Sequence, residues 1–305
     1  MECQTAQSID DILRAALRLT GEDRRRHVRP GVRVQYFFRG ENRNYGSEYD
    51  IYPSIELRPA LYRAPGFLKK ESWFLNEAIR LFPDEFAHDK TTFERLTRLQ
   101  HYGFPTRLAD ITQNLFVATA FACMERDPMC NSRMGFVRVY RVNEDRIKYS
   151  TGDTVTALSK LSMLAEGKIN LKDLEGLAYE VKGERPGFYW RKGDQISQRL
   201  VEDIQKVWCV RPVINNGRIN MQDGSFFLFG CGNGKKSLSA TFSEDDFYKQ
   251  KAATFGIAQI GVIGIPARVK NSFSQVKQFL GVDDQRIYPD LEQLAKTLKK
   301  EVENG

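Results

Sequence analysis

The sequence predicts an α+β fold: a single domain with a mixed or antiparallel sheet at its core and several helical insertions. Short runs of alternating or continuous apolar residues, the pattern of strands, occur from residue 32 to residue 265. The segments between them have helical periodicity but irregular lengths, whereas a doubly wound sheet needs regular βαβ spacing. No repeat, low-complexity tract or clear linker divides the chain. We therefore expect an N-terminal helix and basic connector at 1–30, followed by one globular unit at 31–305.

Capping signals and periodicity define the elements expected in the first part of the chain. Ser8 begins a first helix, which is expected to end at Gly21. Thr91 and Glu94 form a capping box for another helix, which is expected to end at Gly103 because glycine readily adopts the left-handed conformation of a C-terminal cap. The other expected elements here are a strand at 32–38, an amphipathic helix at 71–82 and a buried, almost wholly apolar helix at 115–122.

The same patterns continue through the second part of the chain. Pro266 is expected at a first helical position, and Asp223-Gly224 before an apolar run favours the turn of a β-hairpin. Residues 230–237 resemble a phosphate-binding loop, but the Walker spacing fails, so a flexible turn is expected. The remaining expected elements are strands at 134–142, 207–210, 226–229 and 257–265, and helices at 156–164, at 171–182, up to about 280 and at 290–300.

The composition describes a basic protein without membrane or export features. The formal net charge is +7, which favours polyanionic partners. The run Arg24, Arg25 and Arg26 is the densest basic cluster; it indicates either a surface for nucleic acid or merely a solvated helix end. No stretch approaches the roughly 20 apolar residues of a membrane helix. The N-terminus lacks the pattern of a secretion signal, so the cytoplasm is the expected location.

Cysteine and histidine usage argues against disulfides and bound metal. The five cysteines are an odd number and contain no Cys-x-x-Cys pair, so neither a disulfide framework nor a zinc site is expected. The three histidines are scattered along the chain. We expect no metal cofactor.

The segment from residue 97 to residue 124 is the most informative part of the sequence for function. A polar loop joins the end of one helix to the apolar helix at 115–122, and a polar loop on a rigid, buried support is a good place for a pocket. Its hydrogen-bonding side chains are His101, Tyr102, Thr106, Arg107, Asp110 and Thr112.

Each candidate has an alternative structural role. Arg39, at the end of the strand at 32–38, could clamp a phosphate or carboxylate, or form a buried ion pair with Asp50 or Asp110. His101 could be an acid–base group, or it could interact with the carbonyls at a helix end. Thr112 is best interpreted as a helix cap, whereas Asp110 could cap the helix or face a ligand.

Two motifs carry a resemblance to a known family. Phe38-Arg39-Gly40, and then Gln100-His101-Tyr102-Gly103-Phe104-Pro105-Thr106-Arg107-Leu108-Ala109-Asp110, are similar to those of the FRG domain family. Segments at 218–226 and 287–291 resemble the family as well, so the likeness runs from about residue 35 to 298. The central motif departs from the usual Leu-Asp-Trp-Thr, because it reads Ala-Asp-Ile-Thr at 109–112. This departure removes an aromatic wall but keeps the polar pair.

The order of the motifs also resembles, more distantly, that of ADP-ribosyltransferases of the Arg–Ser–Glu type. The resemblance implies NAD as cofactor and an ADP-ribosyltransferase-like sheet. Arg39 would bind the NAD phosphates or ribose, and Asp110 and Thr112 the ribose next to nicotinamide. Gln222 would take the late catalytic position, where a carboxylate is normally needed. The implied catalytic residues are Arg39, His101, Asp110 and Gln222, and the implied cofactor contacts are Arg39, Gly40, Tyr102, Thr106, Arg107, Asp110 and Thr112.

Three functional hypotheses follow. The first is a cytoplasmic NAD-dependent transferase or NAD-degrading effector, a bacterial toxin or antiphage component, with nucleic acid as a favoured acceptor. The second is a non-catalytic module that binds a nucleotide or nucleic acid through Arg39, His101 and Arg107. The third is a nuclease or other hydrolase that uses His101 and Asp110 without NAD.

Overall fold

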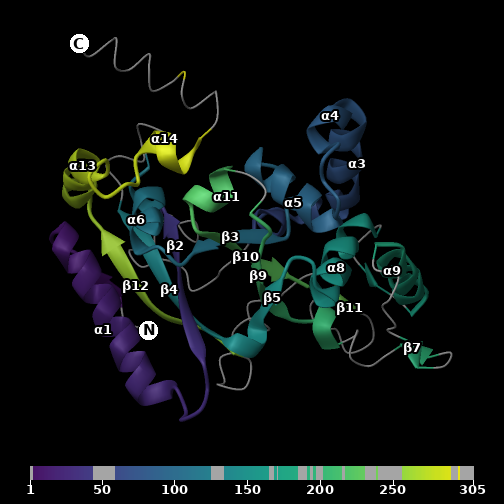
Figure 1. Ribbon diagram of the computed structural model, residues 1–305, viewed down its shortest axis with the longest axis horizontal. Helices are drawn as coiled ribbons and strands as arrows, with labels where there is room; N and C mark the ends of the chain where they lie inside the picture. The colour runs from purple at the N-terminus through teal and green to yellow at the C-terminus, as the bar shows by residue number, and fades with distance from the viewer. Residues whose placement is uncertain are drawn as a thin grey trace.

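The architecture of the chain is seen in a computed structural model (Figure 1). The residues that it describes are 3–43, 59–124, 134–164, 168–169, 171–184, 191–192, 195–196, 202–214, 217–230, 238–239, 256–289 and 295. Within these residues, no helix combines the length and the apolar character needed to cross a bilayer.

A mixed eight-stranded sheet forms the centre of the fold, which confirms the predicted α+β class. The strand order is β1-β12-β4-β2-β3-β10-β9-β5. Neighbouring strands are antiparallel except β1 with β12 and β5 with β9. The bounds are β1 Cys3–Thr5, β2 Val34–Glu41, β3 Leu108–Thr112, β4 Gly135–Asn143, β5 Ile147–Tyr149, β9 Val207–Arg211, β10 Gly224–Phe229 and β12 Ile257–Ile265. Two small ladders pair β6 Lys168–Ile169 with β11 Leu238–Ser239, and β7 Arg191–Lys192 with β8 Gln195–Ile196.

The sheet is split between its two central strands. β2 pairs with β4 along its whole length, from Val34 to Glu41, and β3 pairs with β10 along its whole length. Between β2 and β3, however, the register consists of the single pair Phe38 and Thr112. The next antiparallel pair would join Arg39 to Ile111, but the strands have separated there. The sheet therefore consists of two ladders, β1-β12-β4-β2 and β3-β10-β9-β5, that meet at one point.

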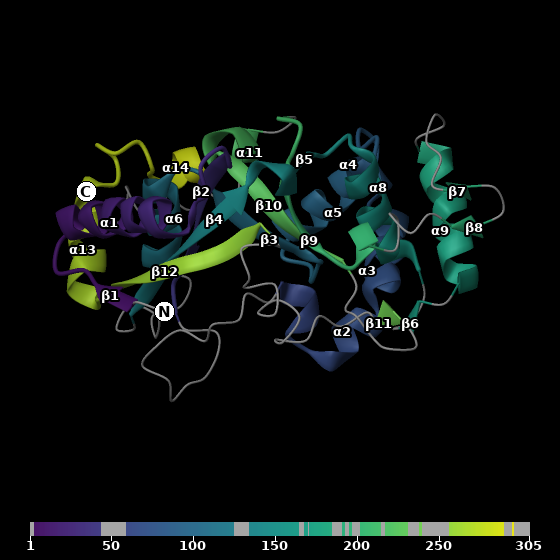
Figure 2. The same ribbon diagram turned by 90° about the horizontal axis from the view of Figure 1, so that it is seen from below.

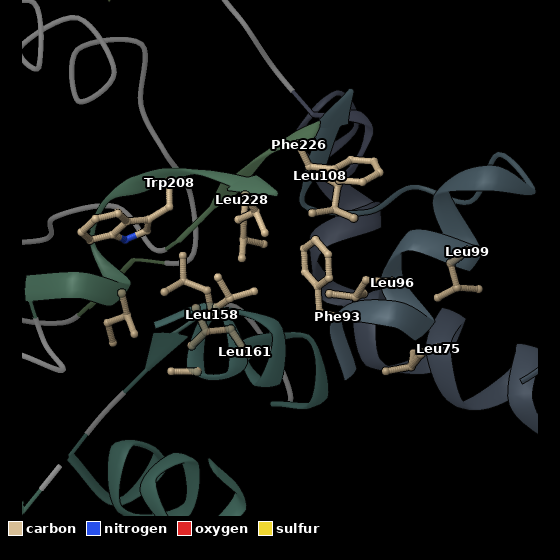
Figure 3. Packing of buried hydrophobic residues seen from close by; sticks show 14 of the residues in the cluster. Leu75, Phe93, Leu96, Leu99, Leu108, Leu158, Leu161, Trp208, Phe226 and Leu228 are labelled. Atoms are coloured by element: carbon tan, nitrogen blue, oxygen red, sulfur yellow. The ribbon is translucent and has the colours of Figure 1, made fainter. Parts of the chain in front are cut away.

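Two groups of helices cover the same face of this sheet, one over each ladder (Figures 1 and 2). Helices α1 Ile9–His27, α6 Leu115–Cys123 and α13 Ala267–Val276 cover the first ladder. The second ladder is covered by α3 Glu71–Leu81, α5 Thr92–His101, α8 Asp153–Lys160 and α9 Leu171–Glu184. Figure 3 shows the second core, in which Phe93 and Leu158 face Phe226 and Leu228 of β10. The shorter helices are η1 Ala60–Tyr62, α2 Pro65–Lys69, α4 Pro83–Phe86, η2 Glu144–Arg146, η3 Leu161–Met163, α11 Gly217–Met221 and α14 Asp284–Ile287.

The opposite face of the sheet carries its own apolar cluster. Phe37 of β2, Tyr140 of β4 and Phe227 of β10 belong to it and are fully buried. Their strand neighbours Phe38 and Phe226 point to the helical face, because successive side chains of a strand alternate. Both faces of the central strands are thus buried.

Helix α6 lies unusually close to the sheet because two glycines face it. A Cβ atom at Gly40 of β2 would lie 1.9 Å from the carbonyl oxygen of Ala118. At Gly135 of β4 it would lie 2.2 Å from the carbonyl oxygen of Ala122, one turn further along α6. Gly40 was predicted as a cofactor contact. The structure gives this residue a steric role, since any side chain there would displace the helix.

Several predicted boundaries are wrong. α1 continues through Gly21 to His27, because Tyr36 and Arg141 bind Asp23 and hold the C-terminal half of the helix against the sheet. The predicted hairpin at Asp223 does not form, because the residues before the turn form helix α11. Pro266 is the N-cap of α13 and not its first helical residue. β1 and α14 were not predicted. The helix expected at 290–300, apart from residue 295, and most of the turn expected at 230–237 fall outside the described residues.

The segment that was interpreted as a polar loop contains strand β3. Thr112 is the last residue of this strand, and Asn114 caps α6 by accepting hydrogen bonds from the N–H groups of Phe116 and Val117. The predicted capping role of Thr112 is therefore wrong. The capping box of Thr91 and Glu94 is confirmed.

Candidate functional site

A cavity of about 400 Å³ lies at the split, where β2 and β3 separate and the helices α5, α6 and α11 converge. Its walls include seven of the residues singled out in the sequence: Arg39, Gly40, His101, Tyr102, Asp110, Thr112 and Gln222. These residues span more than 180 positions and come from β2, α5, β3 and the turn after α11. The fold brings them together because each lies at or next to the break in the central ladder.

Arg39 bridges the gap between the two ladders. Its Nη1 donates a hydrogen bond of 2.7 Å to the backbone carbonyl of Asp110, and its Nε donates one of 3.2 Å to Oε1 of Glu41. The Asp110 carboxylate lies 4.0 Å from the same Nη1. The guanidinium thus supplies the cross-strand bonding that the separated backbones of β2 and β3 lack. The predicted ion-pair alternative holds for Asp110, and Glu41 is an additional partner.

Positive and negative side chains alternate next to the cavity. Glu41 lies between Arg39 and Arg138, and Arg138 Nε donates to Glu41 Oε2 at 2.8 Å. Burial favours the neutral form of Glu41, but the two arginines outweigh it and lower the pKa of this carboxyl group. Burial likewise opposes the charge on Arg39, while Glu41, Asp110 and Tyr140 together raise its pKa. The site therefore holds a fixed positive group at its base.

Asp110 presents a carboxylate to the cavity and is held in place by a relay of hydrogen bonds. Its side chain is 51% exposed, in contrast to the buried Glu41. Gln100 Nε2 donates to Asp110 Oδ2 at 3.0 Å, and Gln100 Oε1 accepts a hydrogen bond from the hydroxyl of Thr106. Thr106 Oγ1 in turn accepts from the N–H of Leu108. Thr106, predicted as a cofactor contact, thus acts through Gln100 and does not line the cavity.

Thr112 joins β3 to the turn that follows α11. Its hydroxyl donates to the backbone carbonyl of Gln222 at 2.7 Å and accepts from the N–H of Asn114 at 3.0 Å. The side-chain amide of Gln222 donates to the carbonyl of Ile287 at 2.9 Å. Gln222 therefore lines the cavity while its amide fixes the turn against α14.

Replacing Thr112 with valine is expected to lower the free energy of unfolding by about 1–2 kcal/mol. The substitution keeps the shape of the side chain, but it leaves the partly buried Gln222 carbonyl and the Asn114 N–H without this partner. Urea denaturation measures the change. The control is Thr119→Val, since that hydroxyl donates to a carbonyl of its own helix, that of Leu115. A loss for Thr112→Val no larger than that for Thr119→Val would show that the hydroxyl does not secure the turn.

His101 and Tyr102 form a flat aromatic surface beside the cavity. Their rings are stacked with centroids 5.1 Å apart and an interplanar angle of 7°. Tyr102 is exposed, and its hydroxyl donates to Glu85 at 2.7 Å, which holds the ring in place. A planar ring of a ligand could extend this stack.

Arg107 is buried in an ion pair inside the protein. It is buried, its Nε donates to Glu71 Oε1 at 2.7 Å, its Nη2 also binds Glu71, and its Nη1 donates to the carbonyl of Phe229 at 3.0 Å. These contacts lie away from the cavity, and Arg107 is absent from the cavity walls. The predicted role of Arg107 in binding stays a prediction, and its guanidinium is already paired with Glu71 inside the protein.

The sequence did not point to several residues that shape the site. Glu41 could have been found, since it lies two positions beyond Arg39 on a strand and so shares its face. Gln100 lies one position before His101, on the last turn of α5, and its role depends on a partner ten residues away. Arg63 also lines the cavity, and nothing in the local sequence distinguishes it from other surface arginines.

The basic cluster Arg24, Arg25 and Arg26 lies exposed at the end of α1. Among the described residues, no group of three His, Cys, Asp or Glu side chains is placed to hold a metal ion. The side chains that line the cavity thus include guanidinium groups, carboxylates, amides, hydroxyls and aromatic rings.

Fold and site together define an α+β protein with a split mixed sheet and a polar cavity at the split. Residues 34–129 match the family model of the FRG domain. The match runs from the start of β2 to just beyond α6 and includes Arg39, His101 and Asp110. A search of curated proteins and a search of solved structures each gave no match. The resemblance to ADP-ribosyltransferases stays a prediction.

Proposed function

We propose that the cavity binds NAD and that the protein is an NAD-dependent transferase or NAD-degrading effector. The observation that carries the proposal is the position of Arg39, whose guanidinium spans the split at the base of the cavity. Arginine is well suited to phosphate, because its planar fork can donate two parallel hydrogen bonds. The cavity volume lies within the range of small-molecule sites. The stacked His101 and Tyr102 offer a surface for a nicotinamide or adenine ring.

Asp110 is the residue that we assign to the chemical step. Cleavage of the nicotinamide–ribose bond sends the bonding electrons to nicotinamide and leaves positive charge on the ribose. A carboxylate beside the ribose stabilises that charge. Asp110 is exposed to the cavity and oriented by Gln100, whereas Gln222 carries no charge and its amide is bonded to Ile287. Water, or an acceptor nucleophile that loses its proton, would then complete hydrolysis or transfer.

The effector role belongs to the same proposal. A bacterial toxin or antiphage protein that consumes or transfers NAD would act on targets in the cytoplasm. The exposed Arg24, Arg25 and Arg26 support a nucleic acid as the acceptor, through attraction to its phosphates.

Titration of NAD into the purified protein, followed by an assay for nicotinamide release, tests the proposal. Arg39→Ala is expected to weaken NAD binding at least about tenfold, because charged hydrogen bonds contribute about 1.5–3 kcal/mol. Asp110→Asn is expected to retain binding and to slow nicotinamide release about 100-fold or more. Arg80→Ala is the control, since Arg80 is exposed and pairs within its own helix with Glu77. Equal NAD binding by wild type and Arg39→Ala, or none at millimolar NAD, would contradict the proposal.

A non-catalytic nucleotide-binding module is the second candidate. The observation in its favour is that Gln222, which lines the cavity and was predicted to take the late catalytic position, is an uncharged amide where a carboxylate is normally needed. In that case NAD or another nucleotide would bind through Arg39 without release of nicotinamide. Asp110→Asn would then change affinity alone.

A further inference from the structure

An aromatic patch lies on the surface of helices α2 and α3, which pack against each other (Figure 2). It consists of Phe67, Trp73 and Phe74, and the ring centroid of Phe74 lies 5.9 Å from that of Phe67 and 5.4 Å from that of Trp73. Trp73 is 52% exposed and Phe67 is 38% exposed. Large aromatic side chains are usually more deeply buried, so two exposed rings around a third indicate a surface that a partner covers.

Phe74 connects this patch to the cavity at the split of the sheet. Its ring lies against the ring of Phe104, with centroids 6.3 Å apart, and Phe104 lines the cavity. Arg63, which follows η1 and precedes α2, is exposed and lines the cavity as well. A path of aromatic contacts therefore runs from the exposed ring of Trp73 to the cavity wall.

Two lysines give the patch a positive charge. Lys69 is the last residue of α2 and Lys70 precedes α3; both are exposed, and Lys70 Nζ lies 5.9 Å from the centroid of the Trp73 ring. Among the described residues, neither lysine is paired with a carboxylate. Both glutamates of α3 are already paired with arginines. The patch therefore complements a partner that is negatively charged.

We propose that this patch binds a single-stranded nucleic acid, with a base stacked on Trp73 and backbone phosphates beside Lys69 and Lys70. Aromatic rings next to basic side chains are typical of proteins that bind single strands, because every base has a flat face and every linkage carries a phosphate. The bases of a duplex are stacked on one another and cannot use Trp73 in this way. An acceptor role for the strand rests on the proposed NAD-dependent function, whereas the binding itself does not.

The connection to the cavity favours a nucleic acid over a membrane surface. A membrane would contact the outer rings of Trp73 and Phe67 and nothing beyond them. A strand stacked on Trp73 could continue past Phe104 to the cavity, where His101 and Tyr102 form a second aromatic surface. The patch and the cavity would then bind successive parts of one strand.

Fluorescence anisotropy of a labelled oligothymidine of about ten nucleotides, titrated without NAD, tests the proposal. Trp73→Ala is expected to weaken binding about tenfold, because it removes the ring on which a base stacks. Trp73→Phe, which keeps an aromatic ring, is expected to retain most of the affinity. The matched control is Phe82→Ala, because Phe82 is 62% exposed at the opposite end of α3. Wild-type affinity in Trp73→Ala, or an equal loss in Phe82→Ala, would overturn the proposal.

The salt dependence of binding tests the two lysines separately from the ring. Lys69→Gln and Lys70→Gln are each expected to reduce the log–log slope of affinity against salt by about 0.7, the value for one phosphate contact on a single strand. Lys182→Gln is the control, since Lys182 is an exposed lysine on α9, which packs on α8. Unchanged slopes in both variants would overturn the proposal, whether or not Trp73→Ala folds.

Further probes distinguish other partners and other surfaces. A duplex of the same length should bind more weakly than the single strand, and equal or tighter duplex binding would overturn the proposal. Oligothymidine binding that is lost when Arg24, Arg25 and Arg26 are replaced together by glutamine, but kept in Trp73→Ala, would place the strand on α1 instead. Binding to phosphatidylserine vesicles, without binding of the oligonucleotide, would assign the patch to a membrane surface.

Two comparisons complete the test. Tighter binding of oligouridine than of oligothymidine would identify the strand as RNA, since the two backbones differ in the 2′-hydroxyl group. The titrations contain no NAD, so they do not depend on the proposed activity. Oligonucleotide binding through Trp73 without any release of nicotinamide from NAD would support this surface and reject the proposed enzyme.

Discussion

Replacing Gly40 with alanine is expected to lower the free energy of unfolding by about 3 kcal/mol or more, at the upper end of overpacking effects. The added Cβ would lie 1.9 Å from the carbonyl oxygen of Ala118 and 2.7 Å from Cβ of Phe121. Both atoms belong to α6, and a backbone carbonyl inside a helix cannot rotate away. The helix would have to shift as a body, at the cost of its contacts with β2 and β4. Urea denaturation followed by circular dichroism measures the loss.

Gly176→Ala is the control for the change in chain entropy. Gly176 lies exposed within α9, and nothing lies within 4 Å of a Cβ built there. Alanine is expected to stabilise this helix by about 0.5–1 kcal/mol. An equal midpoint for Gly40→Ala and the wild type would show that α6 can move away without loss, and the steric role of Gly40 would be wrong.

Replacing Arg107 with methionine is expected to cost about 3–5 kcal/mol, the usual penalty for breaking a buried ion pair by removing one partner. The side chains of Arg107 and Glu71 are 3% and 6% exposed. Methionine would leave the Glu71 carboxylate and the Phe229 carbonyl buried without this partner. The loss is measured by denaturant unfolding under conditions where the variant still folds.

The double variant Arg107→Met with Glu71→Leu tests the cause. It removes both charges together, so it is expected to recover much of the stability lost in Arg107→Met. The folded fraction of either variant should also keep the ligand affinity of the wild type, because Arg107 does not line the cavity. Weaker binding by fully folded Arg107→Met would support the binding role that the sequence suggested.

Local signals in the sequence predicted the longer helices and strands. The capping box at Thr91 and Glu94 is formed within one helical turn, so its residues alone determine it. Strand β2 and the apolar helix α6 were also predicted, because elements that are buried on both faces have largely apolar sequences. The end of α1 was predicted wrongly because it depends on a contact with a residue far away in the sequence. Asp23 is bound by Arg141, which is more than a hundred residues away.

The sequence predicted which residues belong to the candidate site, but it did not predict how they are arranged in space. Arg39, His101 and Asp110 were chosen for their chemistry, and the structure places them around one cavity. The sequence could not separate Arg107 from Arg39, because both are arginines near apolar strands and the difference lies in their remote partners, Glu71 and Asp110. The split between β2 and β3 depends on how far two distant strands pair, which no local pattern encodes.

The break in the sheet also has a consequence for motion. The two ladders are joined at the pair Phe38 and Thr112, and beyond it the guanidinium of Arg39 replaces main-chain bonding to β3. Separating β2 from β3 breaks fewer backbone hydrogen bonds than separating β2 from β4. Local opening of the sheet is therefore expected mainly between β2 and β3. A molecule bound in the cavity would touch Arg39 on one side and Asp110 on the other. A bound ligand would therefore hold the two ladders together. Slower amide hydrogen exchange in both β2 and β3 when the ligand is present would demonstrate this effect.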